Sequence, residues 1–135
     1  RVILPLCSST SPVKVLIVDD DPASRRIIRL ILGQTGRFDF KEAETGADAL
    51  IQMGQDPPDL LILDVHMPDI DGYEVCRILK NNTELSRVRI IVITGLVNTI
   101  KTNKILELDY EYILEKPVNR DELLKTVYSV LEDRV

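Results

Sequence analysis

The segments Val15-Leu16-Ile17-Val18-Asp19-Asp20 and Leu60-Leu61-Ile62-Leu63-Asp64 each join a run of four apolar residues to an acidic end. Short apolar runs of this kind predict β-strands that are buried on both faces. Packing does not easily explain a carboxylate at the end of such a strand. Carboxylates that converge repel one another, and burial strengthens the repulsion. The pattern therefore indicates a cation with oxygen ligands, for which Mg²⁺ is the natural candidate.

Strand and helix patterns alternate along the rest of the chain. We expect strands at 13–19, 38–43, 60–64, 88–94 and 111–114, and helices that begin near residues 22, 46, 73, 98 and 119. Strict alternation implies a parallel sheet with helices on both faces. Ligands of such sheets bind beyond the carboxyl ends of the strands. The predicted fold is therefore α/β, a doubly wound five-stranded parallel sheet with a ligand site at that edge.

The helix ends carry clear capping signals. Asp21 precedes Pro22 and is interpreted as a helix cap rather than a metal ligand, and Asn119 with Glu122 predicts a capping box for the last helix. The expected apolar stripe of the first helix is Ile27, Ile28, Ile31 and Leu32. Its expected water-facing residues are Arg25, Arg26 and Arg29.

Length and composition narrow the classes of protein. The chain has 135 residues and a formal net charge of −5, which predicts one domain and argues against direct nucleic-acid binding. No apolar stretch approaches the roughly 18 residues of a membrane span. Its two cysteines lack paired spacing, which indicates a reduced, cytoplasmic compartment. We expect residues 1–12 to be a linker or tag remnant. Because the chain starts with Arg1, we expect it to be either a piece of a longer protein or a trimmed chain.

Four motifs follow one another at the expected strand ends. They are Val18-Asp19-Asp20-Asp21-Pro22, Leu63-Asp64-Val65-His66-Met67-Pro68-Asp69-Ile70-Asp71-Gly72, Ile93-Thr94-Gly95 and Lys116-Pro117. In this order and spacing they resemble the receiver domain of two-component response regulators, over residues 13–133. The resemblance implies a flavodoxin-like fold with strand order 2-1-3-4-5.

The resemblance also implies a phosphorelay function. Asp64 would be the nucleophile that accepts a phosphoryl group from a sensor histidine kinase or a histidine phosphotransfer protein. The implied Mg²⁺ ligands are Asp19, Asp20, Asp64 and the main-chain carbonyl of His66. The domain would thus be a phosphoacceptor switch for an output partner or domain, catalysing its own phosphorylation and slow dephosphorylation, rather than a conventional enzyme.

Two further motif residues complete the implied site. Thr94 would donate a hydrogen bond to a phosphoryl oxygen, and Lys116 would pair with Asp64 before transfer and with the phosphoryl group after it. Pro117 favours a cis bond that aims Lys116 inward. The chain departs from the family at Ile113, where an aromatic switch residue is usual. Strand alternation should send Tyr112 and Ile113 to opposite faces of the sheet.

The resemblance implies one more surface. Receiver domains often pair through the face that 98–108, 111–114 and the last helix would build here. Charges of both signs on that face suit a weak, salt-sensitive homodimer.

Other interpretations stay open from the sequence alone. Taken singly, Asp19 is a strand-end residue, Thr94 an ordinary β-branched strand residue and Lys116 a solvated lysine. A pseudo-receiver that serves as a docking module has the same fold without phosphoryl transfer. A phosphatase of the haloacid dehalogenase type is disfavoured, because that class has an acid two residues after its nucleophile, where this chain has His66.

Overall fold

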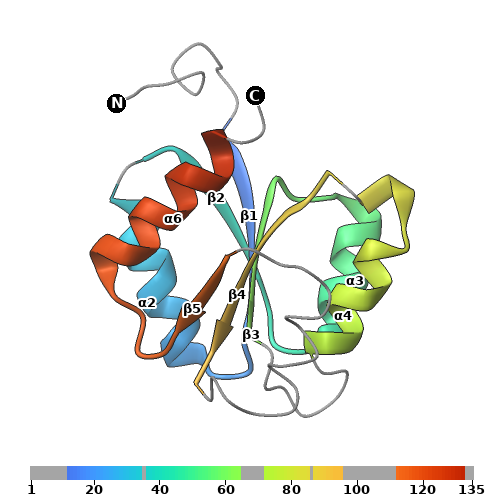
Figure 1. Cartoon of the computed structure of the whole chain (residues 1–135), viewed down its shortest axis with the longest axis horizontal. Helices are drawn as coiled ribbons and strands as arrows, with labels where there is room; N and C mark the ends of the chain where they lie inside the picture. Colours follow the sequence, from blue (N-terminus) through green and yellow to red (C-terminus); the bar gives the residue numbers. More distant parts are fainter. Residues whose placement is uncertain (1–11, 35, 65–71, 86, 96–111, 133–135) are drawn as a thin grey trace.

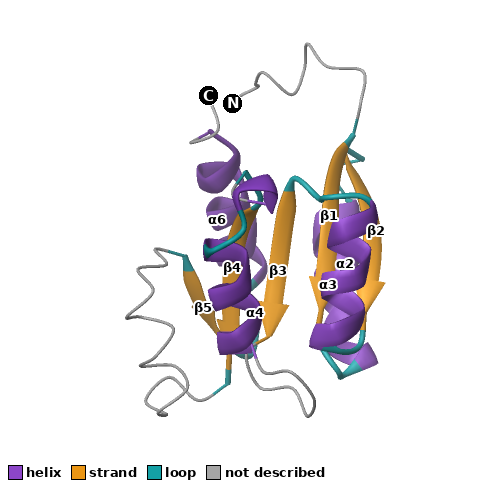
Figure 2. Cartoon of the chain, turned by 90° about the vertical axis from the view of Figure 1, so that its right-hand side faces the viewer, coloured by secondary structure: helices purple, strands orange, loops and turns teal. Residues whose placement is uncertain are grey.

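The computed structural model describes residues 12–34, 36–64, 72–85, 87–95 and 112–132. Its centre is a five-stranded parallel sheet with the strand order β2-β1-β3-β4-β5 (Figure 2). The strands are β1 (Val13–Val18), β2 (Phe38–Ala43), β3 (Leu60–Asp64), β4 (Arg89–Thr94) and β5 (Ile113–Glu115). The predicted fold class and strand order are confirmed.

Helices cover both faces of the sheet (Figure 1). Helices α2 (Pro22–Gly33) and α6 (Arg120–Glu132) lie on one face, and α3 (Gly46–Gln55) and α4 (Gly72–Lys80) lie on the other. A single 3₁₀ turn, η1 (Thr83–Leu85), connects α4 to β4. The helix expected near residue 98 lies outside the described residues. No helix in the described part of the chain is both long and apolar enough to cross a bilayer.

The sheet separates two apolar clusters because successive strand residues point to opposite faces. In β1, Ile17 packs with the α2 and α6 cluster, whereas Leu16 and Val18 pack with the α3 and α4 cluster. All three side chains are at most 2% exposed. Each such burial contributes about 1.5–3 kcal/mol relative to an exposed side chain. The continuous apolar runs of the sequence are therefore explained by helices on both sides.

Capping side chains begin three of the helices where the described chain leaves a strand or loop. Asp21 accepts from the Ala23 amide at 3.0 Å, Thr45 accepts from the Asp48 amide at 3.0 Å, and Asn119 accepts from the Glu122 amide at 3.0 Å. The predicted caps at Asp21 and Asn119 are confirmed. After α2, Gly36 has a φ of 71°, a left-handed conformation that glycine adopts without steric cost.

The predicted faces of α2 need two corrections. Ile27, which we expected in the apolar stripe, is 50% exposed, because Ile28, Ile31 and Leu32 already fill the space against the sheet. Arg25, which we expected to face water, is only 7% exposed. Its guanidinium turns toward the end of β2, where Glu42 accepts its Nε hydrogen at 2.9 Å.

Candidate metal and phosphoryl site at the carboxyl edge of the sheet

The parallel register places the ends of four strands at one edge of the sheet. Val18 of β1 is level with Leu63 of β3, Asp64 with Ile93 of β4, and Thr94 with Glu115 of β5. The arrowheads in Figure 2 accordingly point to the same side of the molecule. Residues directly after these strands are therefore brought together although they are far apart in the sequence.

Three carboxylates meet at this edge, as the sequence predicted. Asp19, Asp20 and Asp64 each offer one oxygen, and these oxygens all lie within 4.8 Å of one another. Asp19 and Asp64 are only 2% and 4% exposed, whereas Asp20 is exposed. Three hard oxygen ligands with one side open to water match the preference of Mg²⁺, which usually keeps several water ligands. The donor set therefore fits the metal that the motifs imply.

Lys116 offsets part of this negative charge. Its Nζ donates a hydrogen bond to Asp19 Oδ2 at 2.9 Å and lies 3.5 Å from Asp64 Oδ2. Burial lowers the pKa of Lys116, but the hydrogen bond to Asp19 and the charges of Asp64 and Asp19 outweigh burial and raise the pKa above its ordinary value. The lysine is therefore a stable cation. The expected pairing with Asp64 exists, and Lys116 also bonds Asp19.

Thr94 and the main chain around it hold Lys116 in place. Thr94 ends β4 with its side chain fully buried, and its carbonyl accepts a hydrogen bond from the Lys116 amide at 2.9 Å. The Lys116–Pro117 peptide is cis, as expected. His66 lies outside the described residues.

Asp19 is fixed by contacts that the sequence did not reveal. Its amide donates to the Ala43 carbonyl at 3.2 Å, and Asp19 Oδ1 accepts from the Asp21 amide at 2.9 Å. Its carbonyl accepts a hydrogen bond from Arg25 Nη1. The only sequence signal for Arg25 was its place in the first turns of α2, close behind the acidic pair. Its partner Glu42 lies on β2, so the local pattern of α2 could not identify the contact.

Tyr112 and Ile113 point to opposite faces, as strand alternation predicted. Tyr112 packs against the α2 and α6 cluster, and Ile113 packs against the α3 and α4 cluster. Both residues are partly buried. An aliphatic residue therefore occupies the position at which the family usually carries an aromatic one.

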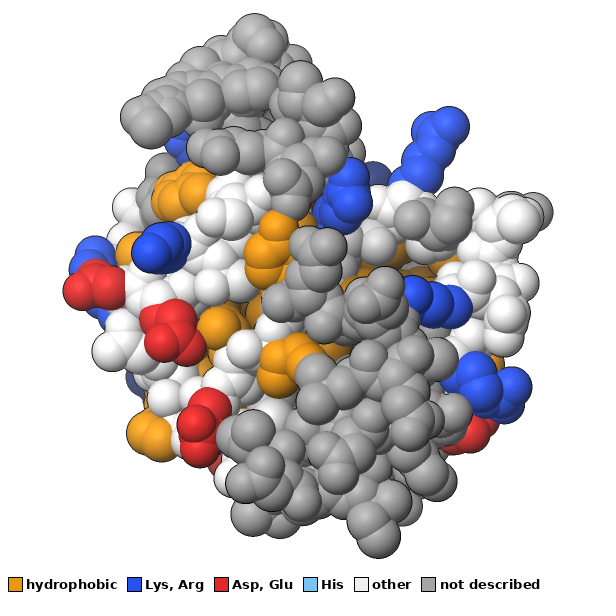
Figure 3. Space-filling model, viewed as in Figure 1, with side chains coloured by type: hydrophobic (Ala, Val, Ile, Leu, Met, Phe, Trp, Pro, Cys, Tyr) orange, Lys and Arg blue, Asp and Glu red, His pale blue; other side chains and the backbone are white. Residues whose placement is uncertain are grey.

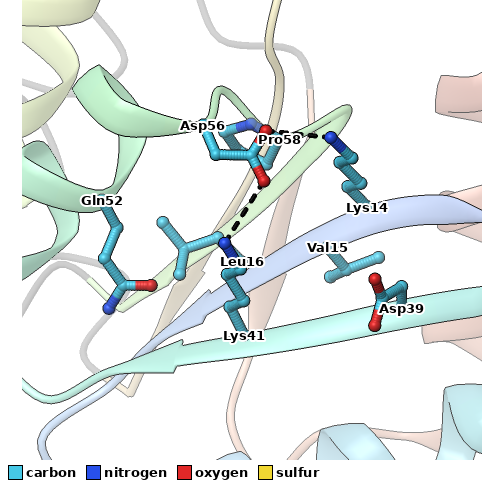
Figure 4. Close-up of a pocket in the computed structure, with 8 residues that line it drawn as sticks. All are labelled: Lys14, Val15, Leu16, Asp39, Lys41, Gln52, Asp56 and Pro58. Atoms are coloured by element: carbon cyan, nitrogen blue, oxygen red, sulfur yellow. Dashed lines mark hydrogen bonds and ion pairs between the residues drawn. The ribbon is translucent and has the colours of Figure 1, made fainter.

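The opposite edge of the sheet carries a different set of charges, which line a small pocket (Figure 4). Asp56 lies between two lysines, 2.9 Å from Lys14 Nζ and 3.2 Å from Lys41 Nζ. The hydrogen bonds from Lys14 and Lys41 lower the pKa of Asp56, and the bond to Asp56 raises the pKa of Lys14. Their side chains are 40–58% exposed, so these are surface ion pairs.

The charges elsewhere on the molecule are mixed. Figure 3 shows acidic and basic side chains of the described residues on both sides of one face, without a continuous basic surface among them. On this face the described residues therefore lack the electrostatic footprint of a nucleic-acid-binding protein.

Comparison with known proteins identifies the family. The model of the response regulator receiver domain family matches residues 15–128. The match covers most of the chain and both strand-end motifs of the opening analysis. The chain therefore belongs to the response regulator receiver domains, and its sheet is of the flavodoxin-like type.

Individual relatives agree with this family. The chain is 35% identical over 120 residues to the response regulator MprA of Mycolicibacterium vanbaalenii, covering 89% of this chain and 51% of that protein. The signal receiver domain of a signal transduction histidine kinase from Syntrophus aciditrophicus is 31% identical, with a TM-score of 0.82 over 89% of this chain and 90% of that one.

A second solved structure gives the same result. The signal receiver domain of a response regulator from Bermanella marisrubri is 30% identical, with a TM-score of 0.77 over 87% of this chain and 97% of that one. The chain spans about half the length of the curated relatives that it matches.

Proposed function

We propose that this domain is the phosphoacceptor of a two-component pathway and that Asp64 receives the phosphoryl group from a phosphohistidine. The observation that carries the proposal is the buried Asp64 carboxylate, which lies with Asp19 and Asp20 in one cluster and beside the Lys116 cation. Phosphoryl transfer depends on positioning and charge compensation rather than on acid–base chemistry. A carboxylate nucleophile within reach of a fixed cation at the ligand edge meets both needs.

The proposed step transfers the phosphoryl group from nitrogen to oxygen. One carboxylate oxygen of Asp64 attacks phosphorus, and the new P–O bond forms as the P–N bond to the donor imidazole breaks. The electron pair of the P–N bond leaves with the imidazole nitrogen. The product on this chain is an acyl phosphate, which water can later hydrolyse at phosphorus to restore the carboxylate.

The surrounding side chains have separate roles in this proposal. The Lys116 ammonium, already 3.5 Å from Asp64, pairs with one phosphoryl oxygen, and the Thr94 hydroxyl donates to another. Asp19, Asp20, Asp64 and the main-chain carbonyl of His66 would hold Mg²⁺. When bound, the ion offsets the negative charge that gathers on the phosphoryl oxygens. Asp19 contributes mainly through water, since Asp21 and Lys116 already bond its two oxygens.

The surroundings of the domain are also part of the proposal. We assign residues 13–133 to the receiver domain and 1–12 to a linker or tag remnant, and we place the protein in the cytoplasm beside a histidine kinase or phosphotransfer partner. The output would lie in a partner or in a further part of the protein. The weak homodimer stays a prediction, because much of its surface, residues 98–108 and 111, lies outside the described part.

A small phosphodonor tests the proposal without the natural partner. Phosphoramidate has a P–N bond like that of phosphohistidine, and with Mg²⁺ it should add one phosphoryl group, seen in the intact mass. Asp64→Asn should abolish the addition. Asp59→Asn, at the other end of β3, is the matched control and should react like wild type. No uptake by wild type would favour the docking-module interpretation, and equal uptake by Asp64→Asn would refute the assignment.

A further inference from the structure

Arg25 is a buried cation directly behind the acidic cluster. Arg25 is only 7% exposed, although it lies on the amphipathic helix α2, whose other face is exposed to solvent. Arginine is rarely buried unless its guanidinium is paired. Here Nε donates to Glu42 Oε1 at 2.9 Å, and Nη2 lies 3.6 Å from Glu44 Oε1. The end of β2 thus holds the guanidinium from one side.

The other side of the guanidinium contacts the acidic cluster. Arg25 Nη1 donates to the carbonyl oxygen of Asp19, which belongs to the peptide that joins Asp19 to Asp20. The orientation of this peptide plane sets the directions in which the Asp19 and Asp20 side chains leave the main chain. The Asp19 amide, bound to Ala43, fixes the preceding peptide plane. Arg25 therefore supplies the restraint on the peptide between the two carboxylates.

Glu42 connects Arg25 to neighbouring helices and strands. Its carboxylate also accepts from Arg29 Nη1, and its carbonyl accepts from Gln52 Nε2 of α3 at 2.9 Å. The residue thus connects α2, β2 and α3 next to the site. A guanidinium held in such a network has little rotamer freedom left to lose, so it can fix the Asp19 carbonyl at small entropic cost.

We propose that Arg25 is a positioning residue of the metal site, which sets the directions of Asp19 and Asp20 by binding the peptide between them. The inference rests on the proposed function, because it assumes that these carboxylates hold Mg²⁺. Partners that orient ligands without touching the metal typically change metal affinity by about 10–100-fold when they are removed.

Arg25→Met tests the role, since methionine fills a buried site of similar length but has no donor. Calorimetric Mg²⁺ titration, well below the thermal midpoint, should show about tenfold weaker binding. The ¹⁵N shift of the Asp20 amide should also move in the metal-free protein. Arg25→Lys keeps one donor, so its Mg²⁺ affinity should lie between those of wild type and Arg25→Met. Arg29→Ala is the matched control: it removes the other guanidinium from Glu42 but does not touch Asp19, and should bind Mg²⁺ within about twofold of wild type.

The outcomes separate this inference from the proposed function. Wild-type Mg²⁺ affinity in folded Arg25→Met would overturn the positioning role and leave the phosphoacceptor proposal standing. Equal weakening in Arg25→Met and Arg29→Ala would show a general effect of the Glu42 network and would also overturn it. Absence of Mg²⁺ binding in wild type would refute both proposals. If Arg25→Met does not fold, Arg25→Leu, which also has no donor, is read by the same criteria.

Discussion

The two edges of the sheet use aspartate and lysine side chains in opposite ways. At the amino edge Asp56 lies between Lys14 and Lys41, with all three side chains 40–58% exposed. At the carboxyl edge three carboxylates cluster, and the Lys116 ammonium pairs with the two buried ones, Asp19 and Asp64.

This contrast indicates which edge is suited to bind a cation. An exposed ion pair is a common surface feature with little effect on stability. Buried carboxylates in excess over cations repel one another and reduce the stability of the free protein. Such a cluster is explained when a bound cation offsets the repulsion. The contrast therefore favours the carboxyl edge over the amino edge as the proposed ligand site.

The largest stability effect is expected from Lys116→Ala. Without the ammonium, Asp19 loses its hydrogen bond and two buried carboxylates lose their nearest cation, so the free energy of unfolding should fall by about 1–3 kcal/mol. Phosphoryl uptake from phosphoramidate should become slower but remain on Asp64. Urea unfolding and the rate of mass increase measure the two effects, with the exposed Lys125→Ala of α6 as control. An unchanged unfolding free energy would mean that Lys116 does not compensate the cluster.

A smaller effect of opposite sign is expected from Asp20→Asn in the absence of metal. Removing one of three carboxylates relieves repulsion, but Asp20 is exposed and partly screened, so the free energy of unfolding should rise by about 0.5–1 kcal/mol. Wild type should gain stability when Mg²⁺ is added, and Asp20→Asn should lose most of that gain. Asp39→Asn removes the same charge near the amino edge and should show neither change. A destabilised metal-free Asp20→Asn would contradict the repulsion argument.

The smallest effect is expected at the amino edge, from Asp56→Asn. Its ion pairs are exposed, so the thermal midpoint near neutral pH should stay close to that of wild type. Because the folded-state pKa of Asp56 is lowered, its contribution is present above the ordinary carboxyl pKa, roughly 4. Any difference from wild type should therefore disappear as the pH falls below that range. A loss of phosphoryl uptake in Asp56→Asn would contradict the proposal that only the carboxyl edge takes part in phosphoryl transfer.

Much of the fold could be predicted from local patterns. The apolar runs that end at Val18 and Leu63 indicated buried strands, and the caps at Asp21 and Asn119 indicated helix starts. The carboxylates could be placed together because all strands were predicted to be parallel. Strand β5 was located less well: it begins at Ile113, two residues later than expected. A three-residue edge strand pairs with only one neighbour, so its length leaves a weak signal.

The predictions for Arg25 and Ile27 were wrong because contacts with other elements decide whether these side chains are buried. Arg25 was assigned to water because a charged residue on an amphipathic helix usually faces solvent. Its burial depends on Glu42, which comes 17 positions later and on another element. Ile27 was assigned to the core because it is apolar and adjoins the stripe of Ile28, Ile31 and Leu32. It is exposed because α2 has more apolar residues than its contact with the sheet can cover. Neither property is encoded in the helix itself.

A Mg²⁺ titration followed by NMR shows in one experiment whether the carboxyl edge, rather than the amino edge, binds the ion. The account predicts that millimolar Mg²⁺ shifts the amides of Asp19, Asp20 and Asp64 in wild type, with little change at Lys14, Lys41 and Asp56. Asp20→Ala should lose the response at the carboxyl edge. No shift at the carboxyl edge in the millimolar range, or larger shifts at the amino edge, would contradict the account.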